Sequence, residues 1–277
     1  MKALDQDPDN LKLHHNYAIL VAEQGNMGVA LELLDKIVEK DPNYGAAHFS
    51  RGNVLKYLGR RDEALKSYHR VSILEPEHYP AHQNLGFMWL AAGNPGRALD
   101  HFARTYELRR GDNLQNYVAS SFKMTTTAKL KHDASLFRIL ASKDIRNPRW
   151  RKLVEAYETI GEQIGDSTVE LSNGQIDILG DDYNTAIYAT DAPEIANRAI
   201  NPKLNWEKIE TDFEDNNSGV VWFDNFITEG ALKLLNKFLH QSTIWHDFAH
   251  IYGFVASYLE EGLACPLLLQ IVEEFRS

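Results

Sequence analysis

Apolar positions recur along the chain with a period of 34 residues between Leu11 and Asp112. Each period holds two apolar stripes at helical spacing, separated by a glycine and closed by a proline. The positions that repeat with this step are His14, His48 and His82; Gly25, Gly59 and Gly93; Ala30, Ala64 and Ala98; Leu31, Leu65 and Leu99; and Pro8, Pro42 and Pro76. The pattern predicts three helix-turn-helix units over 11–44, 45–78 and 79–112, with the small residues where two helices touch.

These units resemble the tetratricopeptide repeat (TPR), whose helix pairs stack into a solenoid. Two positions depart from the family pattern. Histidine stands at the fourth position, where the family often has Trp, and Arg51 stands at a usually apolar one. Apolar residues at helical spacing over 113–123 predict a capping helix, which extends the TPR region to residues 1–127. Because Asp7-Pro8 lies one period before Asp41-Pro42, we expect an earlier repeat before Met1.

Two further helices are predicted over 128–165, and Asn147-Pro148 marks the start of the second. Their apolar stripes are Leu130, Ala134, Phe137 and Leu140, and then Trp150, Leu153, Val154, Tyr157 and Ile160. A run of basic residues from Lys129 to Lys152 is expected to be a solvated helix face, because no aromatic platform for nucleobases is interleaved with it. Periodicity then fades, so residues 166–218 are expected to be a connector with short elements.

Residues 219–277 begin with a β-prone run, Val220 to Phe223, and continue with two predicted helices. Thr228 is placed to cap the first helix, and Pro266 to begin the second. The stretches 220–227, 242–245 and 258–269 resemble the opening of a 2-oxoglutarate- and iron(II)-dependent dioxygenase domain, of the kind fused behind TPR repeats. The expected fold class is therefore mainly α: a TPR solenoid, a helical extension, a connector, and a small, incomplete α/β segment over 219–277.

The second resemblance implies a non-haem iron held by two His and one carboxylate, two of them from a His-x-Asp or His-x-Glu motif. None of the 11 His residues begins such a motif. The pairs His132-Asp133 and His246-Asp247 are adjacent in sequence, so on a strand their side chains would point to opposite faces. Nothing in the spacing of His240, His246 and His250 fixes these three side chains in convergent geometry. We expect no catalytic residue, no metal site and no cofactor in this chain. Iron(II) and 2-oxoglutarate enter only if the β-barrel half of the domain follows Ser277.

The net charge of −10 is unevenly distributed, and this bears on the kind of partner. Residues 1–110 hold 14 Lys and Arg against 14 Asp and Glu, whereas residues 166–277 hold 6 against 19. So acidic a C-terminal third disfavours nucleic-acid binding. The single Cys265 excludes a disulfide framework, and no apolar run reaches membrane-spanning length. We therefore expect a soluble, cytoplasmic protein that binds neither nucleic acid nor membrane.

Peptide binding is the activity that the TPR resemblance implies, on the concave face formed by the first helices of the units. The candidate residues on this face are Lys12, His15, Phe49, Asn53, Lys56, Tyr57, Gln83, Phe87 and Leu90. Only Asn53 and Lys56 approach the clamp with which some family members hold a terminal carboxylate, so that clamp is not expected. Two occupants remain open: a partner protein or peptide, or the chain's own C-terminal segment.

We therefore expect a TPR peptide-binding scaffold attached to an incomplete dioxygenase-like domain that is non-catalytic as given. The alternative is the N-terminal part of a TPR-fused, 2-oxoglutarate- and iron(II)-dependent hydroxylase whose catalytic residues lie beyond Ser277. A TPR-fused glycosyltransferase or sulfotransferase is a more remote alternative. No phosphosulfate-binding loop supports the latter.

Overall fold

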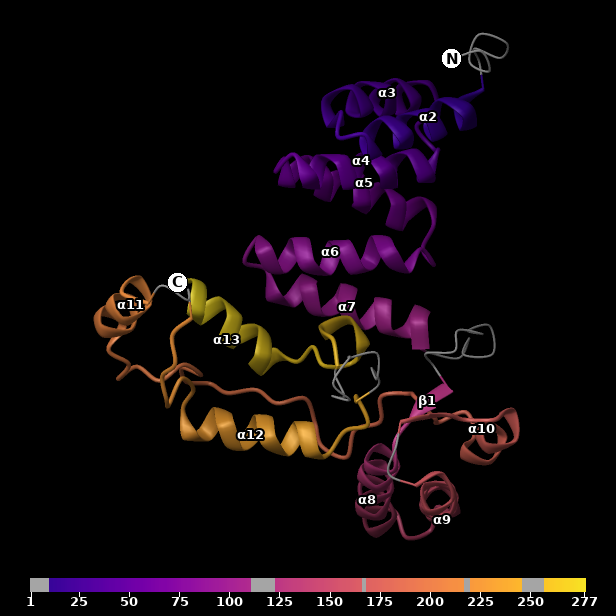
Figure 1. Ribbon diagram of the computed structural model, residues 1–277, viewed down its shortest axis with the longest axis vertical. Coiled ribbons are helices and arrows are strands. Elements are labelled where there is room, and N and C mark those ends of the chain that lie inside the picture. The colour runs from indigo at the N-terminus through magenta and orange to yellow at the C-terminus, as the bar shows by residue number, and fades with distance from the viewer. Residues whose placement is uncertain (1–9, 111–122, 166–167, 217–219, 246–256) are drawn as a thin grey trace. The chain divides into compact units, whose positions relative to one another are not determined.

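The computed structural model describes residues 10–110, 123–165, 168–216, 220–245 and 257–277, and the chain divides into two compact units, Met1–Arg109 and Arg110–Ser277. Helices dominate both units, which confirms the mainly α fold class (Figure 1). The strands named within the described residues are β1 (Met124–Thr125) and β2 (Val169–Glu170), paired antiparallel. None of the helices in these ranges combines the length and the hydropathy needed to cross a membrane.

Three helix pairs form the first unit, and they coincide with the three units that the 34-residue period predicts. A glycine with positive φ lies between the helices of each pair: Gly25 at +84°, Gly59 at +74° and Gly93 at +71°. Such angles favour glycine, which explains why this residue type is repeated. The pairs are α2 (Leu11–Glu23) with α3 (Met27–Lys40), α4 (Gly45–Tyr57) with α5 (Arg61–Leu74), and α6 (Tyr79–Ala91) with α7 (Pro95–Arg110).

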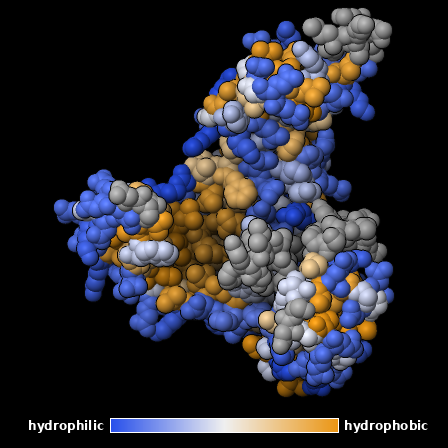
Figure 2. Space-filling view, in the orientation of Figure 1, coloured by the Kyte–Doolittle hydropathy of each residue, from blue (hydrophilic) through white to orange (hydrophobic). Residues whose placement is uncertain are grey.

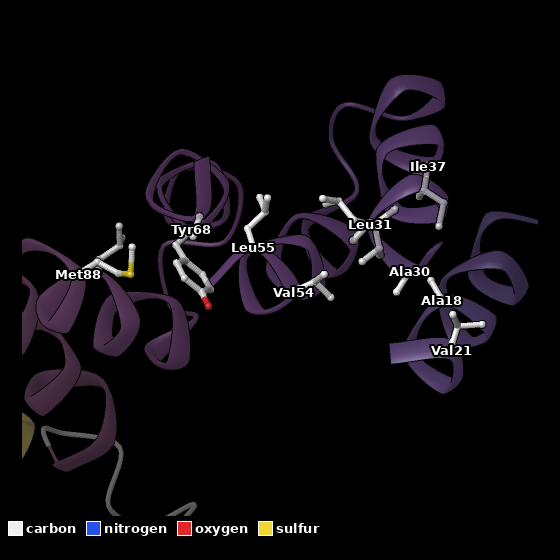
Figure 3. Packing of buried hydrophobic residues seen from close by; sticks show 13 residues of the cluster. Ala18, Val21, Ala30, Leu31, Ile37, Val54, Leu55, Tyr68 and Met88 are labelled. Atoms are coloured by element: carbon white, nitrogen blue, oxygen red, sulfur yellow. The ribbon is translucent and has the colours of Figure 1, made fainter. Parts of the chain in front are cut away.

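Buried apolar side chains from successive helices form one continuous cluster through α2 to α6 (Figure 3). Ala30, Ala64 and Ala98, one on each second helix, are 0% exposed, as is expected of small residues at helix contacts. Arg51 is accommodated at its usually apolar position by polar partners. Its Nε donates to Asp35 Oδ1 at 2.5 Å, and its Nη1 donates to the hydroxyl of the buried Ser67 at 2.7 Å.

The repeated histidine has a structural role that accounts for its departure from the family pattern. His48 Nε2 lies 3.0 Å from the carbonyl oxygen of Pro42, and His82 Nε2 lies 3.1 Å from that of Pro76. Because a carbonyl oxygen only accepts, each ring nitrogen must be the donor. The contact ties the start of a first helix to the loop before it. The same contact between histidine and proline thus occurs in the second and third units.

In the second unit, α8 (Thr127–Lys143) and α9 (Pro148–Ile164) pack as a pair. The Thr126 hydroxyl accepts from Lys129 N, and the Asn147 side chain accepts from Arg149 N, so the predicted start at Asn147-Pro148 is confirmed. The interpretation of the basic run as a solvated face is wrong for Lys129. That side chain is buried and forms an ion pair with the buried Asp133, one helical turn further along α8.

The segment expected as a connector contains α10 (Asn173–Leu179) and α11 (Trp206–Glu214). Ser172 and Gln175 form a capping box at the start of α10. The phenol of Tyr183 donates to Met124 O at 2.9 Å. The segment also contributes buried side chains to the core of α8 and α9: Leu171, Leu179, Tyr183 and Ala189. Residues 168–189 therefore complete that core.

The last described stretches contain α12 (Glu229–His240), the 3-10 helix η3 (Leu259–Glu261) and α13 (Pro266–Arg276). Thr228 caps α12 and Pro266 begins α13, as predicted. The β-prone run from Val220 is not a strand. Its β propensity needs a neighbouring strand, and the only pairing found there in the described residues is an isolated bridge between Ile200 and Ile227. The predicted capping helix at 113–123 falls almost entirely outside the described residues.

Candidate peptide-binding face

The first helices α2, α4 and α6 carry every residue predicted to bind peptide. On α2, Lys12 is exposed. On α4, Asn53, Lys56 and Tyr57 are exposed within one helical turn. On α6, Gln83 is half-buried and Phe87 is exposed one turn later. These six residues are called the first-helix face below.

Two aromatic side chains dominate the exposed apolar area of this face. Tyr57 is 73% exposed, and Phe87 is 43% exposed while its ring meets Phe102 of α7 edge to face at 5.0 Å between centroids. Phe102 is itself fully buried, so Phe87 is held on one side by the core and open on the other. Large apolar side chains left in water at such positions are typical of interaction sites.

Polar groups on this side also join α4 to α6. Lys56 Nζ donates to Asn84 Oδ1 at 2.7 Å, and Asn84 Nδ2 donates to Pro80 O at 2.9 Å. Asn53 Oδ1 accepts from the Tyr68 hydroxyl at 2.8 Å, which orients the Asn53 amide. Burial raises the pKa of Tyr68 well above its usual value, so this phenol stays a donor at any physiological pH.

Three of the predicted binding residues are engaged within the array. His15 is buried, its Nε2 lies 2.8 Å from Ser50 Oγ, and burial lowers the pKa of its imidazole. Phe49 is half-buried, with its ring 5.8 Å from that of Tyr68. Leu90 is buried. We therefore leave these three outside the first-helix face, because packing already takes up their side chains.

Asn84 is a residue of this site that the sequence reasoning missed. It lies at the sixth position of its unit, where the other units have Asn16 and Ser50. A small polar residue at the same position of all three first helices is a signal that could have identified it.

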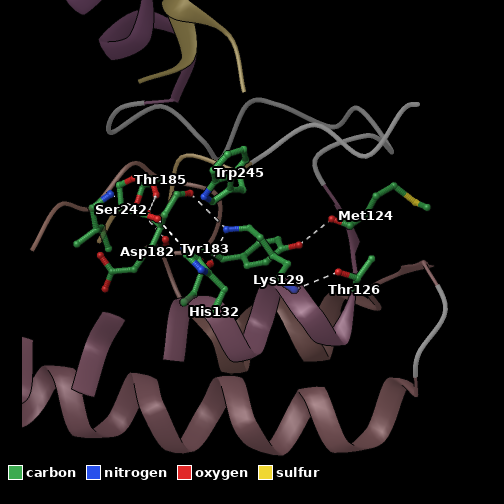
Figure 4. Close-up of polar contacts among 12 residues, drawn as sticks. Met124, Thr126, Lys129, His132, Asp182, Tyr183, Thr185, Ser242 and Trp245 are labelled. Carbon is green, nitrogen blue, oxygen red and sulfur yellow. Dashed lines mark hydrogen bonds and ion pairs between the residues drawn. The ribbon is translucent and has the colours of Figure 1, made fainter. Parts of the chain in front are cut away.

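The described residues do not fit the iron site that the dioxygenase resemblance implies. His132 Nε2 lies 2.9 Å from Ser242 O, while the neighbouring Asp133 pairs with Lys129 (Figure 4). His132, His240 and Trp245 all line a cleft of about 380 Å³. No group of three His, Cys, Asp or Glu able to hold a metal occurs within the described residues, and His246, Asp247 and His250 lie outside them.

Comparison with known proteins agrees with the repeat geometry. Residues 49–113, which span most of α4 and all of α5 to α7, match the family model described as "Tetratricopeptide repeat". The match therefore falls on the second and third helix pairs of the first unit.

Solved structures similar to part of the chain include a MamA mutant, at 30% identity over 40% of this chain and 62% of that one, with a TM-score of 0.36. MamA AMB-1 is 29% identical over 41% of this chain and 62% of its own, with a TM-score of 0.37. The Yersinia enterocolitica type III secretion chaperone SycD, in complex with a peptide of the translocator YopD, is 16% identical over 38% of this chain and 79% of its own, with a TM-score of 0.36. This chain thus spans 62% of the length of these MamA structures.

Proposed function

We propose that the first-helix face of the repeat array binds a peptide segment of a partner protein. The observation that carries the proposal is the exposure of Tyr57 and Phe87 on the first helices of consecutive repeats, α4 and α6, which Lys56 and Asn84 join. The match of residues 49–113 to the tetratricopeptide repeat supports it, because that stretch contains the same helices.

The chemistry of the face suits an uncharged or weakly acidic peptide with large side chains. The Tyr57 and Phe87 rings offer contact area at a low cost in side-chain entropy. The amides of Asn53 and Gln83 carry both donors and acceptors, so they can bond a peptide backbone in either sense. Lys56 adjoins Tyr57 in sequence, and its ammonium retains donors beyond the one given to Asn84.

The experiment is a selection of binding peptides from a displayed library on the immobilised chain, followed by calorimetric titration of the best peptide. Tyr57→Ala and Phe87→Ala should each lower the affinity for that peptide about tenfold or more, as is usual for aromatic residues at the centre of an interface. Matched controls are Val29→Ala and Ile73→Ala, since both residues are exposed but lie on the second helices α3 and α5. Equal losses from all four substitutions would contradict the proposal.

The chain's own C-terminal segment is the alternative occupant of this face. If it were the occupant, Tyr57→Ala and Phe87→Ala would lower the unfolding temperature together, and the library would yield no peptide. If partner peptides bind instead, Tyr57→Ala should leave the unfolding temperature within about 2 °C, because substitutions of exposed residues change stability by less than about 0.5 kcal/mol. Phe87→Ala also removes the ring contact with Phe102, so Tyr57→Ala is the variant that separates the two occupants.

For residues 219–277 we propose no catalytic role within this chain. The resemblance to a dioxygenase rests on the sequence of 220–269, and the residues that the structure describes there do not fit an iron site. Anaerobic iron titration and detection of succinate test the proposal. Stoichiometric iron binding with succinate formation by residues 1–277 would overturn it and would favour the oxygenase alternative.

A further inference from the structure

Helix α11 has apolar side chains that the described residues leave partly exposed. Trp206, Ile209 and Phe213 recur at helical spacing on one face, and charged residues occupy most of the rest of the helix. An amphipathic helix normally turns its apolar face to a core. No residue of α11 is buried, however, and Trp206 and Phe213 are 39% and 49% exposed.

The apolar side chains of α11 continue into a cluster of four aromatic rings, and we call this cluster, together with Ile209 and Phe213, the aromatic face. Trp206 lies 6.3 Å from Phe223 and 6.0 Å from Phe275 of α13, and Phe226 lies 5.9 Å and 5.6 Å from the same two rings. Phe275 is 59% exposed. Apolar residues also gather over α13 and toward α12 (Figure 2).

The surroundings of the aromatic face are acidic. Between Lys203 and Glu229 the sequence holds two lysines and seven carboxylates. One of the lysines, Lys208, lies 3.9 Å from Asp212 and is thereby partly neutralised. Glu207, Glu210, Glu214 and Asp224 are exposed and have no ion-pair partner within the described residues. Because charges across an interface are complementary, an apolar centre with a negative rim favours a partner that carries positive charge around an apolar stripe.

We propose that the aromatic face docks a cationic amphipathic helix of another protein. The apolar stripe of such a helix would cover the Trp206, Phe223, Phe226 and Phe275 rings, and its lysines or arginines would meet the carboxylates of α11. A second copy of this chain fits poorly, because a symmetric contact would place one acidic rim against the other. This surface lies in the second unit and is separate from the first-helix face.

A synthetic, fluorescein-labelled helix of leucine and lysine in amphipathic order is the probe, and its anisotropy is followed as the full chain is added. We expect saturable binding in equimolar ratio that weakens as salt is raised. The same helix with glutamate for lysine, or with serine for leucine, should bind at least about tenfold more weakly, since each lacks one of the two contributions. Equal binding of the glutamate version would overturn the proposal.

Substitutions locate the binding surface. Phe275→Ser and Phe213→Ser should each lower the affinity of the chain for the leucine-lysine helix about tenfold. Ile145→Ser and Ile178→Ser are matched controls, because both residues are exposed elsewhere in the same unit, and they should leave affinity unchanged. Phe213 makes no ring contact found in the described residues, so its variant remains informative if Phe275→Ser unfolds. Unchanged affinity in Phe213→Ser with native circular dichroism would overturn the assignment.

Sedimentation velocity of the chain alone provides the remaining arm of the test. We expect a monomer at the concentrations used for the titration, in the wild-type chain and in Phe275→Ser alike. A dimer that Phe275→Ser dissociates would show that a second copy covers the face, and would overturn the proposal. The double variant Tyr57→Ala with Phe87→Ala should bind the probe with the affinity of the wild-type chain. This result would separate the aromatic face from the first-helix face.

Discussion

The ring of Tyr68 occupies the space that a side chain on Gly52 would need: an ideal Cβ there would lie 2.7 Å from Tyr68 Cε1. The next unit repeats the relationship, with 2.6 Å between a Cβ on Gly86 and Phe102 Cε1. In the first unit the equivalent positions hold Ala18 and the smaller Leu34, both buried. The two positions thus vary together in size, and their combined volume sets how closely the helices of each pair approach.

Gly52→Ala should destabilise the chain because the buried Tyr68 ring cannot move aside. We expect a loss of about 1 to 3 kcal/mol in the free energy of unfolding, measured with urea. The control is Gly28→Ala in α3, where nothing lies within 4 Å of the added Cβ. That variant should be neutral or gain about 0.5 to 1 kcal/mol from helix propensity. Equal stabilities of the two variants would contradict the packing described here.

Ala64→Leu tests the close approach of helices at the repeated alanine. Ala64 is 0% exposed, so the larger side chain should overpack the array at a cost of about 1 to 3 kcal/mol. Ala46→Leu, on the exposed side of α4, is the matched control and should change little. Thermal unfolding followed by circular dichroism compares the two. An unchanged midpoint in Ala64→Leu would mean that this alanine does not mark a helix contact.

Acidification should weaken the first unit through its buried and half-buried histidines. Burial lowers the pKa of His48 and His82, and it lowers the pKa of His101 to about 4. Unfolded histidines titrate near 6.5, so the unfolded chain binds more protons between the two values. The free energy of unfolding should therefore be level above pH ~6.5 and fall as the pH drops from there toward 4.

His82 and His101 contact each other and should dominate this pH dependence. His82 Nε2 donates to Pro76 O, which leaves His82 Nδ1 as the acceptor for His101 Nδ1 at 3.1 Å. His101→Leu removes one titrating ring, so its urea-unfolding free energy should fall less steeply than the wild type's between pH 6.5 and 5. Nitrogen-15 shifts of the imidazoles check the tautomers. A His101 ring that carries its proton on Nε2 at neutral pH would disprove the arrangement.

The buried ion pair of Lys129 and Asp133 should be intolerant of single changes. Burial raises the pKa of Asp133, its Oδ1 has no partner among the described residues, and Lys129 Nζ also reaches Thr243 O at 3.3 Å. Lys129→Met alone would leave a buried carboxylate without its partner, and should lower the free energy of unfolding by about 3 to 5 kcal/mol. The double variant Lys129→Met with Asp133→Leu should recover much of that loss. Additive losses in urea unfolding would show that the two groups are not coupled.

Local signals in the sequence predict the repeats and the helix ends well. Gly59, Asn147 and Thr228 act within a few residues of themselves, so their roles could be inferred from spacing alone. The burial of Lys129 could not be inferred in this way. The four-residue spacing to Asp133 indicates an ion pair, but it does not indicate which segments cover that pair. Val220 to Phe223 failed as a strand for the same reason, since a strand depends on a partner elsewhere in the chain.

The candidate site shows the same limit. Periodicity places all nine predicted residues on first helices, but it does not separate Tyr57, which is open to solvent, from His15 and Leu90, which are buried. That distinction depends on which neighbouring helix each side chain meets. The recurrence of Asn16, Ser50 and Asn84 marks a repeated polar position, but it does not show the bond of Asn84 to Lys56.

The measurement that tests the peptide-binding account most directly is site-specific photo-crosslinking of the library-selected peptide to the full chain. A benzoylphenylalanine is placed in turn at Tyr57, Phe87, Val29 and Ile73, all of which are exposed. We predict crosslinks from positions 57 and 87, on first helices, and none from positions 29 and 73, on second helices. Crosslinks from 29 or 73 with none from 57 and 87 would contradict the account.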